Sequence, residues 1–284
     1  MRASFSGLTV GEGLDVVVVG AVNVSPESFY AGSVVTGRDR LLQTAEGMVE
    51  AGAGMIDVGA MSTAPYRSGP ALSTAEEADR LAGAIDLLAQ KVAVPLSADT
   101  SRLEPARAAV AAGARVINDV TGLTGDPGLA RLVAANAVGL IAMAGERGGD
   151  QREGSPIDLV LLLLEESLRL ATTAGIPAGQ IVLDPGIGFF RRHGLPWYEW
   201  DCRVLASLGR LGELGRPICV GVSRKSFIGA LAGENDPARR LPGSLAATAA
   251  AVLAGAHLIR THDVAETVQA VAVAQAIRRA REAR

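Results

Sequence analysis

Polar side chains that could do chemistry stand at the ends of short apolar runs. Asn23, Asp99, Asn118 and Asp184 each close such a run. Two carboxylates and a carboxamide that converge can donate and accept hydrogen bonds along a planar heterocycle with an amino group beside a ring N–H. Asp99, Asn118 and Asp184 are therefore predicted to recognise a guanine-like or pterin-like edge. The alternative is that each only anchors a loop or caps the next helix.

Basic side chains stand at the ends of the last two runs. Lys225 lies in "GVSRKSFIG", and it is one of only two lysines in the chain, with Lys91. Such a lysine could hydrogen-bond a ring carbonyl, form a Schiff base or bind a phosphate. Arg260 and His262, in "IRTHDV", suit diphosphate oxygens because both donate N–H groups. We expect these cations on the side of the site opposite the carboxylates, unless Arg260 only pairs with Asp263 and His262 is structural.

The elements that must position these residues alternate along the chain. Eight apolar runs rich in Val and Ile alternate with longer segments of helical period, as in parallel strands joined by crossover helices. The strands are expected at 15–24, 54–60, 94–100, 115–122, 138–145, 181–188, 217–224 and 257–264. The helices are expected at 38–52, 74–91, 103–113, 127–136, 157–174, 198–214, 239–255 and 265–281, with helix starts at Ser73 or Thr74 and at Asp126.

Eight such pairs in 284 residues favour an α/β fold of the TIM (β/α)8 type over an open doubly wound sheet. We expect one domain, residues 1–284, with the barrel at about 15–281, because no Gly/Ser-rich linker divides the chain. In such barrels chemistry takes place at the carboxyl ends of the strands, where side chains converge on one mouth. The residues named above occupy those ends.

Composition limits the partners and the compartment. Apolar residues make up 49% of the chain and charged residues 20%, and the formal charge is −3, which gives no general attraction to nucleic acid or to an anionic membrane. Cys202 and Cys219 are too few for a disulfide framework, and no apolar run reaches the length of a membrane span, so we expect a cytoplasmic protein. The sequence contains no His/Cys metal cage, so a divalent ion would have to be shared with a ligand phosphate.

The motifs at the strand ends resemble those of the dihydropteroate synthase family of pterin-binding barrels. "NVSPESF" is similar to the family's first-strand motif, and "SADT", "INDVTG", "LDPGIGF", "GVSRKSFIG" and "IRTHDV" match later strand ends in order. The resemblance extends from about Val16 to Ile277. The last two motifs are typical of the synthase branch rather than of the methyltransferase relatives.

The resemblance implies an activity. In this family a dihydropterin carrying a hydroxymethyl diphosphate loses diphosphate, and the amine of a p-aminobenzoate-like arene takes its place. Small-molecule substrates, Mg²⁺ and a homodimer are implied with it. By position, the pterin would be bound by Asp99, Asn118, Asp184 and Lys225. The diphosphate would be bound by Asn23, Arg260 and His262, and Asn23 would also contact Mg²⁺. The aryl amine would be bound by Phe29, Ser62, Thr63, Pro65, Phe189 and Ser226. Asn23, Asp99, Lys225, Arg260 and His262 would carry catalysis.

Two loops depart from the family's usual pattern. Ala31 stands at an acidic position, and Met61 and Ala64 replace the Glu and Arg of the loop after the second strand. These loops are similar to those of archaeal homologues associated with tetrahydromethanopterin, in which the aryl amine bears a ribofuranosyl phosphate. That phosphate could meet one of three arginines, although each could also be a plain surface residue: Arg67, Arg191 and Arg192.

Three further alternatives stay open at this level. The chain could be a methyltransferase that uses a methylpterin and a corrinoid partner, or a pterin-binding protein without catalysis. The aromatic segment "FFRRHGLPWYEW" could wall the aryl pocket, or Trp197 and Trp200 could pack between helices or form a dimer contact.

Overall fold

The computed structural model describes residues 1–24, 37–61, 72–145, 154–191 and 194–282. Eight parallel strands in these residues form one sheet, in the order β8-β7-β6-β5-β4-β3-β10-β9. A parallel bridge between Leu183 and Ile218 joins its two edge strands and closes the sheet. The strands are β3 (Val17–Asn23), β4 (Met55–Gly59), β5 (Leu96–Asp99), β6 (Val116–Asp119), β7 (Gly139–Met143), β8 (Ile181–Asp184), β9 (Cys219–Gly221) and β10 (Leu258–Thr261). The predicted (β/α)8 barrel is confirmed.

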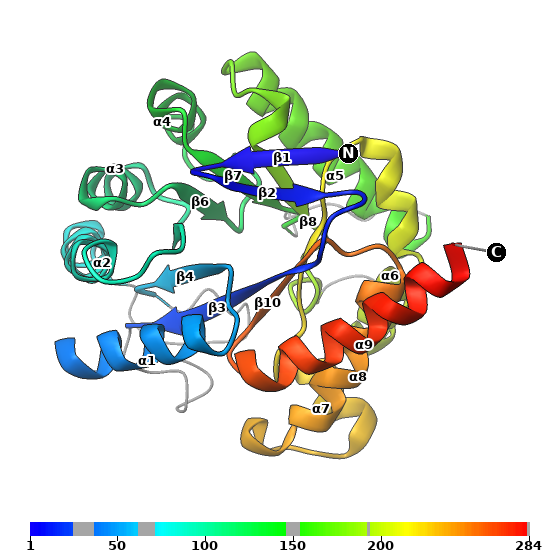
Figure 1. Ribbon diagram of the computed structural model, residues 1–284. Coiled ribbons are helices and arrows are strands. Elements are labelled where there is room, and N and C mark those ends of the chain that lie inside the picture. The colour runs from blue at the N-terminus through cyan, green and yellow to red at the C-terminus, as the bar shows by residue number, and fades with distance from the viewer. Residues whose placement is uncertain (25–36, 62–71, 146–153, 192–193, 283–284) are drawn as a thin grey trace.

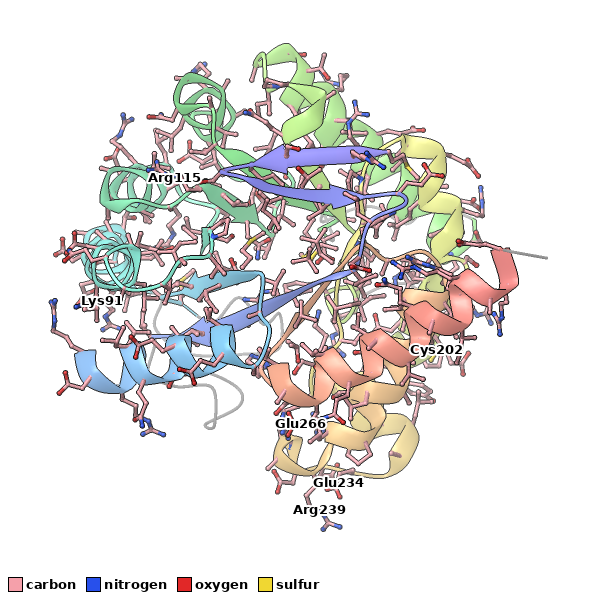
Figure 2. The ribbon with its side chains drawn as sticks, in the orientation of Figure 1. Lys91, Arg115, Cys202, Glu234, Arg239 and Glu266 are labelled. Carbon is pink, nitrogen blue, oxygen red and sulfur yellow. The ribbon has the colours of Figure 1, made fainter. Side chains whose placement is uncertain are left out.

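Helices surround the sheet (Figure 1). They are α1 (Arg38–Glu50), α2 (Thr74–Ala89), α3 (Leu103–Ala112), α4 (Leu129–Asn136), α5 (Pro156–Thr173), α6 (Trp197–Ala206), α7 (Ser226–Ala232), α8 (Leu241–Leu253) and α9 (Val264–Glu282). Their apolar faces bury a continuous core against the strands, whereas charged side chains such as Lys91 and Arg115 are exposed on the outside (Figure 2). None of the helices in the described ranges has the length and apolar character needed to cross a membrane.

Helix boundaries follow local chemistry. Ser73 caps α2 as expected: its hydroxyl accepts a hydrogen bond from the Glu76 N–H at 3.2 Å, and the Glu76 carboxylate accepts one from the Ser73 N–H at 3.2 Å. The start predicted near Asp126 is two residues early, because the Asp126 carboxylate accepts hydrogen bonds from Gly128 N at 2.9 Å and Leu103 N at 3.1 Å and so holds a turn ahead of α4.

Two other segments differ from the prediction. The helix expected at 198–214 divides into α6 and a 3-10 helix, Leu208–Leu214, which contains two glycines, a residue type that weakens α-helices. The helix α7 was not predicted, since its seven residues are too short to show a helical period.

An antiparallel hairpin that was not predicted covers the amino-terminal end of the barrel (Figure 1). Its strands are β1 (Arg2–Phe5) and β2 (Leu8–Gly11), and the turn residues Ser6 and Gly7 have φ of 49° and 83°, as a two-residue hairpin turn requires. Phe5 packs on the barrel: a Cβ built on Gly139, at the start of β7, would lie 2.9 Å from the Phe5 ring. The hairpin thus closes one end and leaves the carboxyl ends of the strands as the mouth.

Candidate active site

Strand register places the first group of predicted residues side by side. Asn23 pairs with Gly59, Gly59 with Asp99, and Asp99 with Asn118, so the ends of β3, β4, β5 and β6 lie at one level. Gly59 has no side chain, and a Cβ built there would already contact the Asp99 carboxylate at 3.7 Å. The glycine therefore leaves the space beside Asp99 open.

An ionic network links Arg260 to two carboxylates inside the mouth. Arg260 Nε donates to Asp57 Oδ2 at 2.6 Å, and Arg260 Nη2 donates to Asp99 Oδ2 at 2.9 Å. Asp57 Oδ2 also accepts from Asn118 Nδ2 at 3.1 Å. Asp57, which sequence reasoning left out of the site, thus connects the arginine to the amide. The sequence could have indicated this residue, because Asp57 is a carboxylate inside an otherwise apolar run.

The partners of Arg260 correct two expectations. Arg260 does not pair with Asp263, whose carboxylate instead receives Nε and Nη2 of Arg224 at 2.9 and 2.7 Å. Nor does Arg260 face the carboxylates across the mouth. Because β10 lies next to β3 and β4 follows β3 in the sheet, the long Arg260 side chain reaches the acids directly. The cation and the acids therefore form one cluster.

Burial leaves parts of this network without partners. In the part of the chain that the structure describes, Asp57 Oδ1 and Asp99 Oδ1 are buried and accept no hydrogen bond. Burial raises the pKa of Asp99 to about 7, with Arg260 opposing this shift and Asp57 adding to it. Burial without a partner is costly for a polar oxygen, so these two atoms could accept hydrogen bonds from the N–H groups of a ligand.

A second cluster forms where β8 ends. Asp184 Oδ1 accepts from Gly186 N at 2.7 Å, and Lys225 Nζ donates to the carbonyl oxygen of Ile187. Lys225 Nζ also lies 5.0 Å from the centroid of the Phe189 ring, within range of a cation–π contact. Burial raises the pKa of Asp184 and lowers that of Lys225, and in each case the other's charge opposes the shift. Asp184 and Lys225, which were predicted to bind the pterin, therefore lie close to Phe189, which was predicted to contact the aryl amine.

Arg224 orients its two neighbours. It has φ of 54°, in the left-handed region, and its buried guanidinium is held by Asp263 and by the carbonyl oxygens of Pro237 and Ala238 at 3.0 and 2.6 Å. The left-handed backbone at Arg224 turns the chain so that Lys225 points to the loop after β8. On the other side of Arg224, Ser223 Oγ lies 3.0 Å from His262 Nδ1. Burial and the Arg260 charge lower the pKa of His262 to about 3, so the imidazole is neutral and has one N–H to donate.

Asp201, on α6, supports the loop after β8 and was missed from the sequence. It is fully buried, and its Oδ1 accepts from Gly188 N at 2.8 Å. Burial raises the pKa of Asp201 to about 6, and the hydrogen bond from Gly188 opposes the shift. An aspartate among the aromatic residues of "WYEWDC" was the available signal.

The aromatic segment contributes to the core, which is one of the two roles considered for it, and the wall of the aryl pocket stays a prediction. Trp200 is buried and stacks on Phe190, with ring centroids 5.1 Å apart, so it packs in the core. Trp197 is partly buried, and the guanidinium carbon of Arg191 lies 4.1 Å from its ring centroid. Arg191 is partly buried and donates to Ser226 Oγ at 2.7 Å, so it is not the plain surface residue that was considered.

The remaining predicted residues lie outside the described ranges. These are Phe29, Ser62, Thr63 and Pro65, together with Ala31, Ala64, Arg67 and Arg192. Met61, one of the substituted positions, is partly buried.

This closed barrel carries buried carboxylates beside a lysine at its strand ends, which is where enzymes of the TIM-barrel class have their active sites. Residues 19–262 match the family described as "Pterin binding enzyme". The dihydropteroate synthase of Synechocystis sp. is 36% identical over 266 residues, 92% of this chain and 89% of that protein. The chain therefore belongs to the pterin-binding enzyme family, among transferases of the dihydropteroate synthase type.

Solved structures agree with this assignment. A Yersinia pestis dihydropteroate synthase, solved with a sulfonamide drug, has a TM-score of 0.87 and 33% identity, over 99% of this chain and 100% of that one. A Xanthomonas albilineans dihydropteroate synthase, solved with 4-aminobenzoic acid, has a TM-score of 0.84 and 38% identity, over 97% of each chain. The resemblance inferred from the strand-end motifs is confirmed.

Proposed function

We propose that the protein condenses a dihydropterin 6-hydroxymethyl diphosphate with p-aminobenzoate and releases diphosphate, a step of folate biosynthesis. The observation that carries this proposal is the buried floor. Asp57 and Asp99 present unpartnered oxygens there, beside Asn118, Asp184 and Lys225. A pterin edge supplies the N–H donors that such acceptors need.

The pterin would be bound by Asp99, Asn118, Asp184 and Lys225. The Asn118 amide is oriented by Asp57, and Lys225 can turn its ammonium from the Ile187 carbonyl to a ring carbonyl of the ligand. The carboxylates at the edge of the ring would stabilise the positive charge that develops on the pterin and its methylene as the C–O bond breaks. The amine nitrogen then bonds to that carbon and loses a proton, and no covalent enzyme intermediate is needed.

The diphosphate would be bound by Asn23, Arg260 and His262. Asn23 ends β3 next to Gly59, and burial lowers the pKa of His262 to about 3, so its ring is neutral. Arg260 keeps its charge: burial favours loss of the proton, but the Asp57 and Asp99 carboxylates outweigh burial and raise its pKa. The departing anion therefore meets a permanent cation.

The donor set near Asn23 fits a shared Mg²⁺ ion. No group of three or more His, Cys, Asp or Glu side chains within the described ranges could hold a metal alone. The Asn23 carboxamide oxygen is a hard ligand of the kind that Mg²⁺ takes, with substrate phosphates and water completing its shell. Bound there, the ion would neutralise charge on the diphosphate.

The aryl amine would lie along Phe189 and Ser226, with Phe29, Ser62, Thr63 and Pro65 as further proposed contacts. The Xanthomonas relative was solved with 4-aminobenzoic acid, which supports p-aminobenzoate as the amine. The ribofuranosyl phosphate derivative serves as the competing substrate in the test.

The test incubates the protein with dihydropterin diphosphate, Mg²⁺ and either amine, and follows diphosphate release. We expect release with p-aminobenzoate, and its loss in Lys225→Met. Lys91→Met is the matched control, because Lys91 is the other lysine and is exposed. Binding of the pterin without release in the presence of either amine would overturn the proposed function, and release with the ribofuranosyl phosphate derivative alone would overturn the choice of amine.

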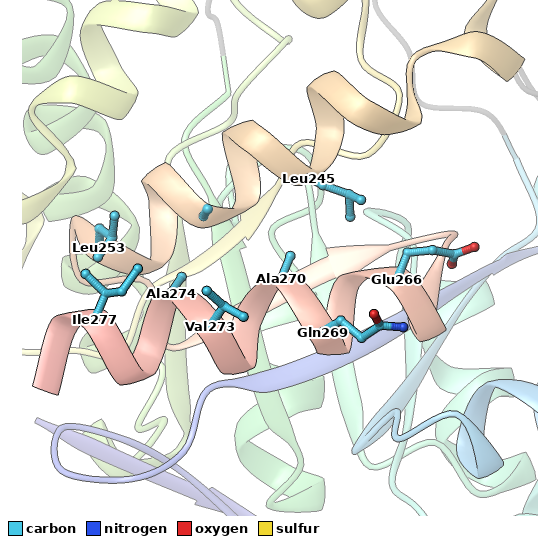
Figure 3. A pocket seen from close by; sticks show the side chains of 9 residues that line it. Leu245, Leu253, Glu266, Gln269, Ala270, Val273, Ala274 and Ile277 are labelled. Atoms are coloured by element: carbon cyan, nitrogen blue, oxygen red, sulfur yellow. The ribbon is translucent and has the colours of Figure 1, made fainter.

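We also propose a homodimer, the assembly that the family resemblance implies. An apolar groove of about 420 Å³ lies between α8 and α9, lined by Leu245, Leu253, Ala270 and Ala274 with exposed Val273 and Ile277 (Figure 3). A ridge and a groove in the same patch suit an isologous two-fold contact. Light scattering should give a dimer that Val273→Asp dissociates. The control Leu231→Asp, at a leucine of α7 with similar exposure, should leave the dimer intact. A dimeric Val273→Asp protein would contradict this interface.

Two further points of organisation are proposals of the same kind. The hairpin formed by β1 and β2 packs on the amino-terminal end of the barrel, which supports treating the chain as one domain. Cys202 and Cys219 are both free, which supports a reducing cytoplasmic location.

A further inference from the structure

Glu77 is a buried carboxylate on the face of α2 that packs against the barrel. Its side chain is 1% exposed, and the other buried residues of this helix are apolar: Leu81, Ala84, Ile85 and Leu88. A carboxylate in such a place loses its hydration, and a well-packed apolar side chain is often as stabilising there as a buried ion pair. Packing alone therefore does not explain an acid at this position.

Both oxygens of the Glu77 carboxylate accept hydrogen bonds. Oε1 accepts from Thr100 Oγ1 at 2.6 Å, and Oε2 accepts from Arg102 Nη1 at 3.1 Å. Arg102 Nη1 also donates to Leu72 O at 2.8 Å, and the Arg102 backbone N–H donates to Thr100 Oγ1 at 3.3 Å. Glu77 thus joins α2 to the segment between β5 and α3, two helices that pack against each other (Figure 1).

The segment that Glu77 holds begins directly after Asp99. Thr100 is buried, its N–H donates to Asn118 O at 3.1 Å, and its hydroxyl donates to Glu77. Successive side chains of a strand point to opposite faces, so Asp99 points into the mouth toward Arg260 whereas Thr100 points to the helix layer. The peptide that follows Asp99 is therefore fixed by β6 on one side and by α2 on the other.

We propose that Glu77 is a positioning residue for pterin binding, which acts through the Thr100 hydroxyl and fixes the orientation in which the Asp99 carboxylate meets the ligand. This inference rests on the proposed function, because it requires that Asp99 accepts hydrogen bonds from the pterin. A purely structural role is the alternative, in which Glu77 only ties α2 to α3. A positioning residue acts through Asp99, whereas a structural residue has the same effect whichever side chain stands at position 99.

A double-mutant cycle distinguishes the two roles. Pteroate is titrated by calorimetry, which needs no turnover, into the wild-type protein, Thr100→Val, Asp99→Asn and the double variant. Thr100→Val removes the hydroxyl and keeps both the shape of the side chain and the charge of Glu77. It should weaken binding of pteroate roughly 3- to 10-fold, within the range of coupling between residues in contact, and should have almost no effect in the Asp99→Asn background.

Further variants separate the hydrogen bond from a loss of stability. Thr100→Ser keeps the hydroxyl and should bind pteroate like the wild-type protein. Glu77→Met removes the acceptor and should weaken binding as Thr100→Val does. These titrations are made at pH 8, above the Asp99 pKa of about 7, where loss of the nearby Glu77 charge changes the ionisation of Asp99 little. Asp79→Met, at an exposed position of the same helix, is the matched control and should leave binding unchanged.

The outcomes separate this inference from the proposed function. Equal weakening by Thr100→Val in both backgrounds would overturn the inference, and so would unchanged binding in Thr100→Val. In kinetics, Thr100→Val should raise the KM for dihydropterin diphosphate but not that for p-aminobenzoate, and an equal rise in both would likewise overturn the inference. If the cycle shows the expected coupling but neither amine releases diphosphate, the proposed reaction fails while the assignment of Glu77 holds. Pteroate binding in Asp99→Asn as tight as in the wild-type protein would overturn the assignment of Asp99 and the role of Glu77 together.

Discussion

Replacing Asp99 by Asn should make the protein more stable at alkaline pH and nearly inactive. Asp99 is buried beside Asp57, its Oδ1 has no partner in the described part of the chain, and its pKa is raised to about 7 from 3.8. Between these two values the folded protein keeps a proton that the unfolded chain has lost. The free energy of unfolding therefore falls as pH rises through this window.

The magnitude follows from the width of the window. From pH 5 to the Asp99 pKa of about 7 there are about two units, each about 1.36 kcal/mol, so ionisation removes about 3 kcal/mol from the wild-type protein by pH 8. An asparagine does not ionise. The free energy of unfolding of Asp99→Asn, relative to that of the wild-type protein, should thus increase by about 3 kcal/mol between pH 5 and pH 8. That shift corresponds to roughly 6 °C in Tm for a chain of this size.

Calorimetric scans of both proteins at pH 5 and pH 8 measure this shift. The buried histidines His257 and His262, whose pKa values burial lowers to about 4 and about 3, contribute stability that increases with pH, but both proteins contain them and the difference cancels their effect. Asp86→Asn, at an exposed position of α2, is the control for replacing an aspartate by asparagine. A Tm difference between Asp99→Asn and wild type that is the same at both pH values would refute this reasoning. Diphosphate release should fall at least 100-fold in Asp99→Asn, because the pterin loses a carboxylate acceptor.

Three other changes test neighbouring parts of the structure. Gly188→Ala should weaken pterin binding about tenfold in calorimetry, because Gly188 has φ of 84° and a Cβ there would lie 3.0 Å from Lys225 Cδ, and unchanged binding would show that the loop tolerates a side chain. Asp201→Ala should lower the free energy of unfolding in urea by about 1–3 kcal/mol and raise the KM for the amine, because it leaves the Gly188 N–H buried without an acceptor. Asp201→Asn keeps an acceptor, so its stability and KM should remain close to those of the wild-type protein. Ser73→Ala should cost about 1 kcal/mol by removing the α2 capping box with Glu76 while leaving kcat unchanged, and equal stability would contradict a contribution from the cap.

Local chemistry determined which elements could be predicted. The barrel followed from apolar runs alternating with helical segments, and the polar ends of those runs located the mouth, because parallel strands bring their carboxyl ends to one side. Short elements were not predictable in this way. The hairpin before β3 and the seven residues of α7 are stabilised by packing and turn geometry rather than by a period of their own.

The sequence by itself determined the family and the residue types at the strand ends, because these are read position by position along the chain. Only the tertiary structure decided how those residues pair. Arg260 reaches Asp57 and Asp99, about 200 and 160 positions away in the chain, because β10 lies next to β3 and close to β4 and β5 in the sheet. Arg191 meets Ser226 because α7 begins beside the loop after β8. Burial, which raises the pKa of Asp99, exists only when all eight strands enclose the same space.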